Sequence, residues 1–326
     1  MKYARSVFCT AVLLLLTACG TSNPPTTGTP IKSVPIVYVD SGFASPAQVL
    51  AFPGNSTGNP SPSSTISLPT LTIPVSIATD PAGNVYLGTY TDIREYTAGS
   101  SGAATPARSI LLASSGITYP NAVTADATGN IYVADFPTSS IENFSAAASG
   151  SAAPSRILSG TLTGLTFPSQ IALDGAGNLY VFNLNVQNPS SPSSILVFGP
   201  KANGNVAPDR VLNEIASGMT VDSSGDVYIL PFGGVEVFAP GASGNATPIR
   251  TISDKFIASY GVPTDGIAVD SNGNIYIVTE TTLPSSSPPT ILCFSVTASG
   301  DAPPANVFTP AAWTPGLLSL ATLAVH

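Results

Sequence analysis

The sequence predicts an all-β fold in which one four-stranded unit is repeated six times, and three observations support this prediction. Tyrosines recur 46 or 48 residues apart, at positions 38, 86, 132, 180, 228 and 276. Each repeat also carries an apolar block that ends in an aromatic residue. The 326 residues include 29 glycines and 31 prolines but only 9% charged residues, a composition that suits short strands joined by turns.

The recurring tyrosine identifies the first two strands of each unit, because it lies in the second strand and the first strand precedes it. The tyrosines lie in β-rich runs such as residues 130–133, 178–181 and 274–277, which we assign to strand B. An apolar segment ending in aspartate precedes strand B and is assigned to strand A, at residues 77–80, 123–126, 171–174, 219–222 and 267–270. Innermost strands crowd around an axis, and small residues share one position of strand A: Ala78, Thr124, Ala172, Thr220, Ala268 and Ala324.

The third strand is the apolar block, and the fourth is an edge strand. We assign strand C to residues 49–52, 93–96, 141–144, 195–198, 235–238 and 291–294. A glycine then precedes a proline by four residues in all six units, as in Gly150 and Pro154. Proline is tolerated at a sheet edge, so the segment after it is predicted to be edge strand D. Recurring arginines two residues after that proline suggest a packing or surface-pairing role in the outer strand, with a ligand site as the alternative: Arg108, Arg156, Arg210 and Arg250.

Four antiparallel strands per unit, repeated six times, predict a six-bladed β-propeller over residues 35–326. The first unit lacks strand A, whereas residues 323–326 form a strand A with no strand B after it. We therefore expect the N- and C-terminal strands to share the closing blade, which removes the exposed edges of an open ring.

The segment Ile-Ala-Val-Asp-Ser-Asn-Gly-Asn-Ile-Tyr-Ile at residues 267–277 resembles the repeats of the NHL and related bacterial propeller families. The resemblance covers residues 35–326, although the Asn-His-Leu signature itself is missing. It implies the fold but not the function, because propellers host binding, scaffolding, lactone hydrolysis and lyase chemistry.

The N-terminal segment predicts export. Lys2 and Arg5 precede an apolar run at residues 7–16, which has the length of a signal-peptide core. The following Leu-Thr-Ala-Cys at residues 16–19 resembles the bacterial lipobox. The resemblance implies a signal peptide at residues 1–18 and lipidation of Cys19, which would hold the protein on a membrane of the cell envelope. Gly20 favours the outer membrane, and residues 19–34 are interpreted as a flexible tether.

Charge and cysteine content exclude several classes of function. The net charge of −8 becomes −10 once Lys2 and Arg5 are removed, which argues against nucleic-acid binding. Of the three cysteines, Cys9 leaves with the signal peptide and Cys19 is acylated, so Cys293 has no disulfide partner and is interpreted as a small buried residue. We expect a monomer.

Two motifs with possible chemical roles have simpler structural explanations. Five repeats carry Asp-x-x-Gly followed by Asn or Asp, and a turn between strands A and B needs these residues whether or not calcium binds. Residues 54–58 match Gly-x-Ser-x-Gly, but the string falls in a turn between strands C and D, and the only histidine, His326, is the last residue. We expect His326 to occupy the turn position that aspartate holds in the other blades.

Candidate site residues are sought on the B–C and D–A loops, which surround the mouth of the axial channel and differ between blades. Our leading hypothesis is a non-catalytic binding or scaffold module, without a cofactor, for a protein, glycan or small ligand. The alternative is a lactonase-like hydrolase that uses Ca²⁺ or another divalent metal, and a purely structural role is a third hypothesis. The ligand-binding candidates are Tyr90, Asp135, Asn183, Asp265 and Glu280, and the metal ligands of the alternative are Asn121, Asn183, Asp265 and Glu280. Asp92 and Gln170 lie in the same loops.

Overall fold

The computed structural model describes residues 34–40, 47–70, 72–184, 193–214, 216–231, 234–280, 289–311 and 323–326. For Asp40, residues 262–265 and Glu280 it describes the backbone only. The predicted signal peptide (1–18), Cys19 and nearly all of the predicted tether (19–34) lie outside the described residues, so these remain predictions.

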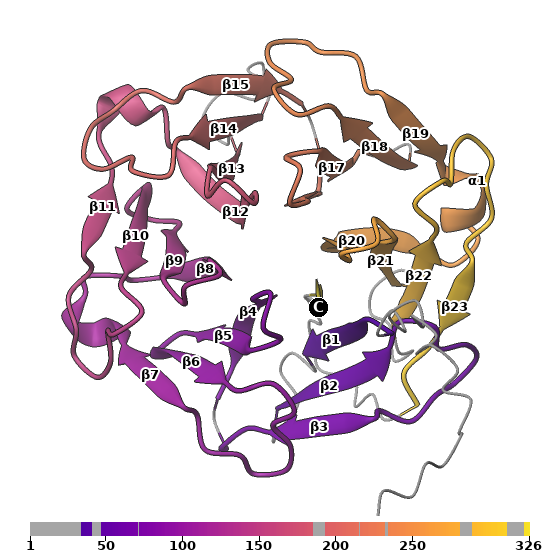
Figure 1. Ribbon diagram of the computed structural model, residues 1–326, viewed down its shortest axis with the longest axis horizontal. Coiled ribbons are helices and arrows are strands. Elements are labelled where there is room, and N and C mark those ends of the chain that lie inside the picture. Colours follow the sequence, from indigo (N-terminus) through magenta and orange to yellow (C-terminus); the bar gives the residue numbers. More distant parts are fainter. Residues whose placement is uncertain are drawn as a thin grey trace, which may run out of the picture. The chain divides into compact units, whose positions relative to one another are not determined.

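Six four-stranded antiparallel sheets form the blades of a ring, which confirms the predicted six-bladed β-propeller (Figure 1). We number the blades I to VI along the chain and name their strands A to D from the centre outward. Blade I consists of β24 (Leu323–Val325), β1 (Ile36–Asp40), β2 (Gln48–Pro53) and β3 (Ser64–Ser67). Because β24 pairs with β1, the two ends of the chain share the closing blade as predicted.

The other five blades follow one another along the chain. Blade II contains β4 (Pro74–Thr79), β5 (Val85–Thr89), β6 (Asp92–Tyr96) and β7 (Arg108–Leu111). Blade III contains β8 (Pro120–Ala125), β9 (Ile131–Asp135), β10 (Ser140–Phe144) and β11 (Arg156–Leu158). Blade IV contains β12 (Phe167–Leu173), β13 (Leu179–Leu184), β14 (Ser194–Phe198) and β15 (Arg210–Asn213).

Blade V contains β16 (Gly218–Val221), β17 (Val227–Leu230), β18 (Gly234–Phe238) and β19 (Arg250–Ser253). Blade VI contains β20 (Val262–Val269), β21 (Ile275–Glu280), β22 (Thr290–Phe294) and β23 (Asn306–Phe308). Short helices occur only in D–A loops of the described chain: the 3₁₀ turns η1 (Leu112–Ser114) and η2 (Thr161–Thr163), and α1 (Asp254–Ile257).

One register is common to all six blades. The recurring tyrosine of strand B pairs directly with the small residue of strand A, as Tyr86 does with Ala78 and Tyr276 with Ala268. In blade I this partner comes from the far end of the chain, where Ala324 pairs with Tyr38. The small residues thus lie on the innermost strands, as predicted.

The hydrophobic core is divided into six clusters, one for each junction between neighbouring blades. The aromatic residue that ends strand C lies in these clusters, and Phe144 and Phe198 are almost completely buried. Cys293 belongs to the cluster between blades VI and I, and burial raises the pKa of its thiol. Its predicted role as a small buried residue is thereby confirmed.

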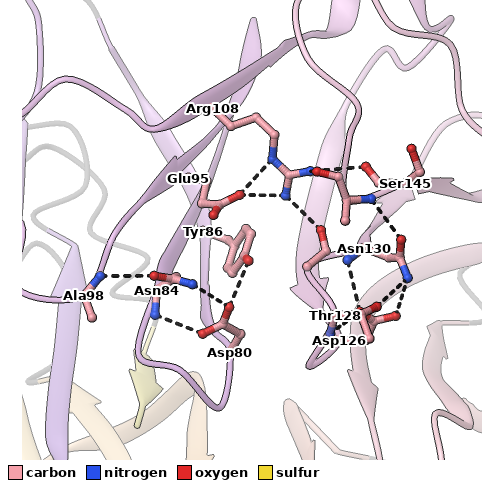
Figure 2. A network of polar contacts seen from close by, with 12 residues as sticks. Asp80, Asn84, Tyr86, Glu95, Ala98, Arg108, Asp126, Thr128, Asn130 and Ser145 are labelled. Carbon is pink, nitrogen blue, oxygen red and sulfur yellow. Dashed lines mark hydrogen bonds and ion pairs between the residues drawn. The ribbon is translucent and has the colours of Figure 1, made fainter. Parts of the chain in front are cut away.

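The A–B turns are held by their aspartates, as the sequence predicted. In blade II, Asp80 Oδ1 accepts the backbone N–H groups of Ala82 and Asn84, each at 2.9 Å. Its Oδ2 accepts the amide of Asn84 at 2.8 Å and the hydroxyl of Tyr86 at 3.0 Å (Figure 2). The backbone of His326 bonds to Ile36 in the equivalent way, which confirms that His326 takes the aspartate position in the closing blade.

The C–D turns connect neighbouring blades through a glycine. In each case the glycine forms a parallel bridge with strand D of the preceding blade, as Gly150 does with Ile110. All six glycines have φ between 58° and 69°, a region that residues with a Cβ disfavour. The glycine four residues before the proline is therefore required by backbone conformation, and Gly58 of the Gly-x-Ser-x-Gly string is one of these turn residues.

The recurring arginines also cross between blades, which confirms their predicted packing role. Arg108 of strand D in blade II reaches blade III, where it donates to the carbonyls of Gly129 at 2.8 Å and Ala146 at 2.6 Å (Figure 2). Its guanidinium also pairs with Glu95 at 2.6 Å. Arg156 makes the corresponding bond to the Pro200 carbonyl in blade IV, at 2.8 Å.

Candidate functional site

The ring has two faces with different connections. The A–B and C–D turns lie at one end of the blades, and the B–C turns and D–A loops lie at the other. The described chain begins at the first end, because Ile36 pairs with Pro53 at the C–D turn and the N–H of Gly54 donates to the Pro35 carbonyl. The opposite end is the face on which the sequence placed its candidate residues, and we call it the loop face.

Four aromatic side chains form a continuous row on the loop face, across blades II to IV. We call this row the aromatic strip; it consists of Tyr90, Tyr119, Phe136 and Phe167. The ring centroids of successive members are 5.2, 6.4 and 4.7 Å apart. Tyr90 is 38% exposed and the other three are half-buried, so the strip is partly open to solvent.

The tyrosines of the strip are hydrogen-bonded to each other. The hydroxyl oxygens of Tyr90 and Tyr119 lie 3.2 Å apart. Burial, followed by the bond to Tyr119, raises the pKa of Tyr90 to about 12, so its hydroxyl keeps its proton at neutral pH. Two hydroxyls carry two protons and their mutual bond uses one, which leaves one O–H that can donate to a ligand.

Asp135, at the end of strand B in blade III, holds the backbone beneath the strip. This side chain is completely buried. Its carboxylate accepts the N–H of Tyr119 at 2.8 Å and that of Thr118 at 3.2 Å, and the hydroxyl of Thr138 donates to it at 2.6 Å. Asp135 therefore fixes the loop that carries Tyr119.

Asn183 has the same role one blade further on. Its Oδ1 accepts the N–H groups of Thr166 at 2.8 Å and Phe167 at 3.2 Å, and its amide donates to the Gly164 carbonyl at 3.0 Å. The hydroxyl of Ser139 donates to the Thr166 carbonyl, which ties the B–C turn of blade III to the same loop. The strip is thus preorganised by buried polar groups.

The positions of the sequence candidates require a correction. Asp135 and Asn183 lie within strands β9 and β13, Asp92 in β6, Asn121 in β8 and Gln170 in β12, and of the described candidates only Tyr90 lies in a turn. Although they differ between blades, Asp135 and Asn183 belong to the repeated framework. Thr89, Asp135, Asn183 and Thr279 occupy the same place near the end of strand B, and all four are buried and bonded to nearby loop or turn backbone.

Asn121 and Gln170 connect blades. The amide of Asn121 donates to the Ser169 carbonyl in blade IV at 2.7 Å, and the side chain of Gln170 accepts the N–H of Met219 in blade V. Asp265 and Glu280 lie in β20 and β21, but their side chains are outside the described part of the chain.

Three members of the strip were missed by sequence reasoning. Tyr119 and Phe167 each stand immediately before the proline at the start of strand A, and Phe136 follows Asp135 directly. These positions carry a detectable signal, since an aromatic residue there is not part of the repeated core pattern.

Among the side chains that the structure describes, no three His, Cys, Asp or Glu gather into a group able to hold a metal ion. The metal-site hypothesis stays a prediction, because its ligands are the asparagines Asn121 and Asn183 together with Asp265 and Glu280, whose side chains are outside the described part of the chain. None of the described helices is both long and apolar enough to cross a membrane.

Comparisons with known proteins agree with the fold. No protein-family model and no curated protein sequence matches the chain. A chain in the crystal structure of a nidogen/laminin complex has a TM-score of 0.56 and 14% identity, and covers 89% of this chain and 98% of its own. A protein of unknown function from Bacteroides caccae has a TM-score of 0.54 and 12% identity over 90% and 99% of the two chains. A putative 6-phosphogluconolactonase from Bacteroides uniformis has a TM-score of 0.51 and 15% identity over 80% and 79%. At these identities the likeness shows the propeller fold alone.

Proposed function

We propose that this chain is an exported, lipid-anchored propeller that binds a ligand through the aromatic strip, without catalysis. The observation that carries the proposal is the strip itself. Its rings are partly exposed, and the polar groups beneath them are buried and bonded to the strip's own backbone. Rigid aromatic side chains on a fixed backbone lose little conformational entropy on binding, and aromatic residues dominate the energetics of binding surfaces.

The attachment point of the chain supports this role. The predicted tether joins the ring at Val34, on the face of the A–B and C–D turns. A lipid on Cys19 would therefore be connected to the ring on that side and not on the loop face. About 15 tether residues reach on the order of 20 Å, which is enough to separate the ring from the lipid headgroups. The nidogen/laminin match is a propeller crystallised with a partner protein, which is compatible with a binding role.

The alternative hypothesis, a metal-dependent lactonase-like hydrolase, is less well supported by the described contacts. Of its four proposed ligands, Asn183 already directs its Oδ1 at two backbone N–H groups. That amide oxygen would have to leave its loop in order to bind a cation. Asn121 bonds to blade IV through its amide nitrogen, so its Oδ1, Asp265 and Glu280 remain as the ligands on which this hypothesis rests.

Two measurements on the full chain test the anchored binding role. Mass spectrometry of the N-terminal peptide should find a diacylated Cys19, and Cys19→Ala should move the protein from the membrane to the soluble fraction. An array of peptides and glycans should give at least one signal that Tyr119→Ala abolishes and that Phe256→Ala leaves unchanged. Phe256 is a matched control, because it is a half-buried aromatic residue in a D–A loop between blades V and VI.

A third measurement addresses the alternative. We expect the full chain to lose no thermal stability in the presence of a chelator, and to show no turnover of lactones or phosphotriesters that depends on Glu280. Stoichiometric calcium that is lost in Glu280→Gln, together with such turnover, would overturn the binding proposal in favour of the hydrolase.

A further inference from the structure

The orientation of the rings in the aromatic strip limits the shape of its ligand. Successive rings are turned against one another by 62°, 58° and 41°. Stacking on a flat sugar chain needs ring faces that share one plane, and these rings do not share one. A polyproline II helix has three residues per turn, so its prolyl rings project in three directions. Rings that face different directions suit such a ligand.

The spacing of the rings is compatible with the same ligand. A polyproline II helix rises about 3.1 Å per residue. Successive centroids of the strip lie 5.2, 6.4 and 4.7 Å apart, so one aromatic ring is available for roughly every two residues of an extended peptide. Recognition of proline-rich segments by aromatic-lined surfaces is a general mode, because the ligand is already extended before it binds.

The polar groups of the strip also match a peptide backbone. The carbonyls of a polyproline II segment have no internal hydrogen bonds and point outward. The hydroxyl pair of Tyr90 and Tyr119 has one O–H to donate to such a carbonyl.

Three polar side chains of blades II to IV in the described part of the chain are already engaged. Asp135 accepts backbone N–H groups, as the amide oxygen of Asn183 does, and Asp92 pairs with Arg94 at 2.9 Å. These groups are therefore not placed to bind the neighbouring hydroxyls of a sugar. The net charge of −8, which becomes −10 without Lys2 and Arg5 of the predicted signal peptide, disfavours an anionic ligand.

We propose that the aromatic strip binds an extended, proline-containing polypeptide segment of neutral or basic charge. This inference rests on the proposed binding role of the loop face and names the chemical class of its ligand. The strip accommodates a segment of about five or six residues.

Isothermal titration calorimetry on the full chain tests the inference with three probes: decaproline, a (Gly-Ser)₅ peptide of equal length, and cellohexaose. We expect decaproline to bind and the other two probes not to bind. Phe136→Ala and Tyr119→Ala should each weaken decaproline binding tenfold or more, as expected for central aromatic residues of a binding surface, and Phe256→Ala should leave it unchanged.

Two further variants keep the test valid if a core-proximal change unfolds the chain, which circular dichroism would reveal. Tyr90→Ala removes an exposed ring, and Tyr119→Phe removes one hydroxyl. We expect each to weaken decaproline binding several-fold. Binding of decaproline that no strip variant weakens would overturn the inference. Binding of cellohexaose that depends on the strip, without decaproline binding, would overturn it too and leave the proposed binding role intact. Strip variants that alter no signal on the peptide and glycan array would overturn both.

Discussion

Glu142, a buried carboxylate in strand C of blade III, should make the protein less stable as the pH rises. It is 5% exposed and lies between Val133 and Ile157 on the neighbouring strands. Ser140 donates to its Oε1 at 2.6 Å, whereas its Oε2 has no hydrogen-bond partner among the described residues. Burial, together with the nearby charge of Asp135, raises the pKa of Glu142 to about 7 although the Ser140 bond opposes this.

The size and sign of the effect follow from proton linkage. The unfolded chain holds this carboxyl near its ordinary pKa of 4.5, so between pH 4.5 and 7 the folded state binds the proton more tightly. Stability is therefore highest below pH 4.5 for this group, falls as the pH rises through that window, and stays low above pH 7. One pKa unit corresponds to about 1.4 kcal/mol, so the loss above pH 7 is about 3 kcal/mol.

The perturbation is Glu142→Gln, which keeps the shape and can still accept the Ser140 hydroxyl, but has no charge at any pH. We expect urea denaturation to show that the variant is more stable than the wild type by up to about 3 kcal/mol at pH 8.5, and nearly equal to it at pH 4.5. Other carboxylates also titrate, so the quantity to compare is the difference between the two proteins at each pH. A difference that is the same at both pH values would refute the reasoning.

A control with the opposite sign is available in the same blade. Burial of Asp126 favours its protonated form, but hydrogen bonds from Asn130 and Thr128 outweigh burial and lower its pKa. Its ionised form therefore stabilises the fold at neutral pH, and this contribution is lost as the pH falls. Asp126→Asn should be less stable than the wild type at neutral pH, with a smaller deficit in acid.

Three other changes have outcomes that follow from single contacts. Gly150→Ala should cost about 1 kcal/mol in thermal unfolding, because its φ is 58° although no atom lies within 4 Å of the added Cβ. Arg156→Ala should lower the free energy of unfolding by on the order of 1 kcal/mol, because it removes the bonds to Pro200 and Tyr132. Arg156→Lys should restore little of this loss, since one ammonium cannot reproduce the guanidinium geometry. Urea titration compares the two variants. Asp135→Ala should lower the free energy of unfolding by about 2 kcal/mol and also weaken the binding of any ligand that depends on Tyr119. Asp135→Asn keeps an acceptor and should therefore have a smaller effect on both. Calorimetry of unfolding and of binding measures the two effects. An Asp135→Ala variant with unchanged ligand affinity would show that the loop does not need this support.

The propeller could be predicted from the sequence because the blades are local repeats. The tyrosine of strand B and the aromatic end of strand C recur in all six blades and the aspartate turn in five, so the repeated copies reveal the register. The closing blade was predictable for the same reason, since an unpaired strand A at residues 323–326 had to meet a unit without one. Strand bounds differ from the prediction by up to five residues, as in blade VI, where strand A was predicted at residues 267–270 and β20 spans Val262–Val269. Strand A also ends one residue earlier than predicted: β4 ends at Thr79 because the side chain of Asp80 caps the following turn.

The candidate site was less predictable, because it is formed between blades. Tyr90, Tyr119 and Phe136 come from two blades, and Phe167 comes from a third. No spacing along the chain indicates that their rings touch. The candidates predicted from the sequence were mostly polar residues that vary between blades, and two of them, Asp135 and Asn183, are supports beneath the aromatic strip.

The supporting residues differ between blades because the loops that they hold differ. Asp135 and Asn183 direct oxygen atoms at loops that present N–H groups. The hydroxyl of Thr279 instead donates to the carbonyls of Tyr260 and Thr290, each within about 3.3 Å, because the neighbouring backbone presents oxygen atoms there. The residue type at this one strand position is thus determined by which backbone groups face it, and a ligand need not be involved. The positions that face solvent lie one residue further along, where Phe136 follows Asp135 and Tyr90 follows Thr89. In blades II and III the side chains are therefore released from the repeated framework immediately after the last buried residue of strand B, and two rings of the aromatic strip lie there.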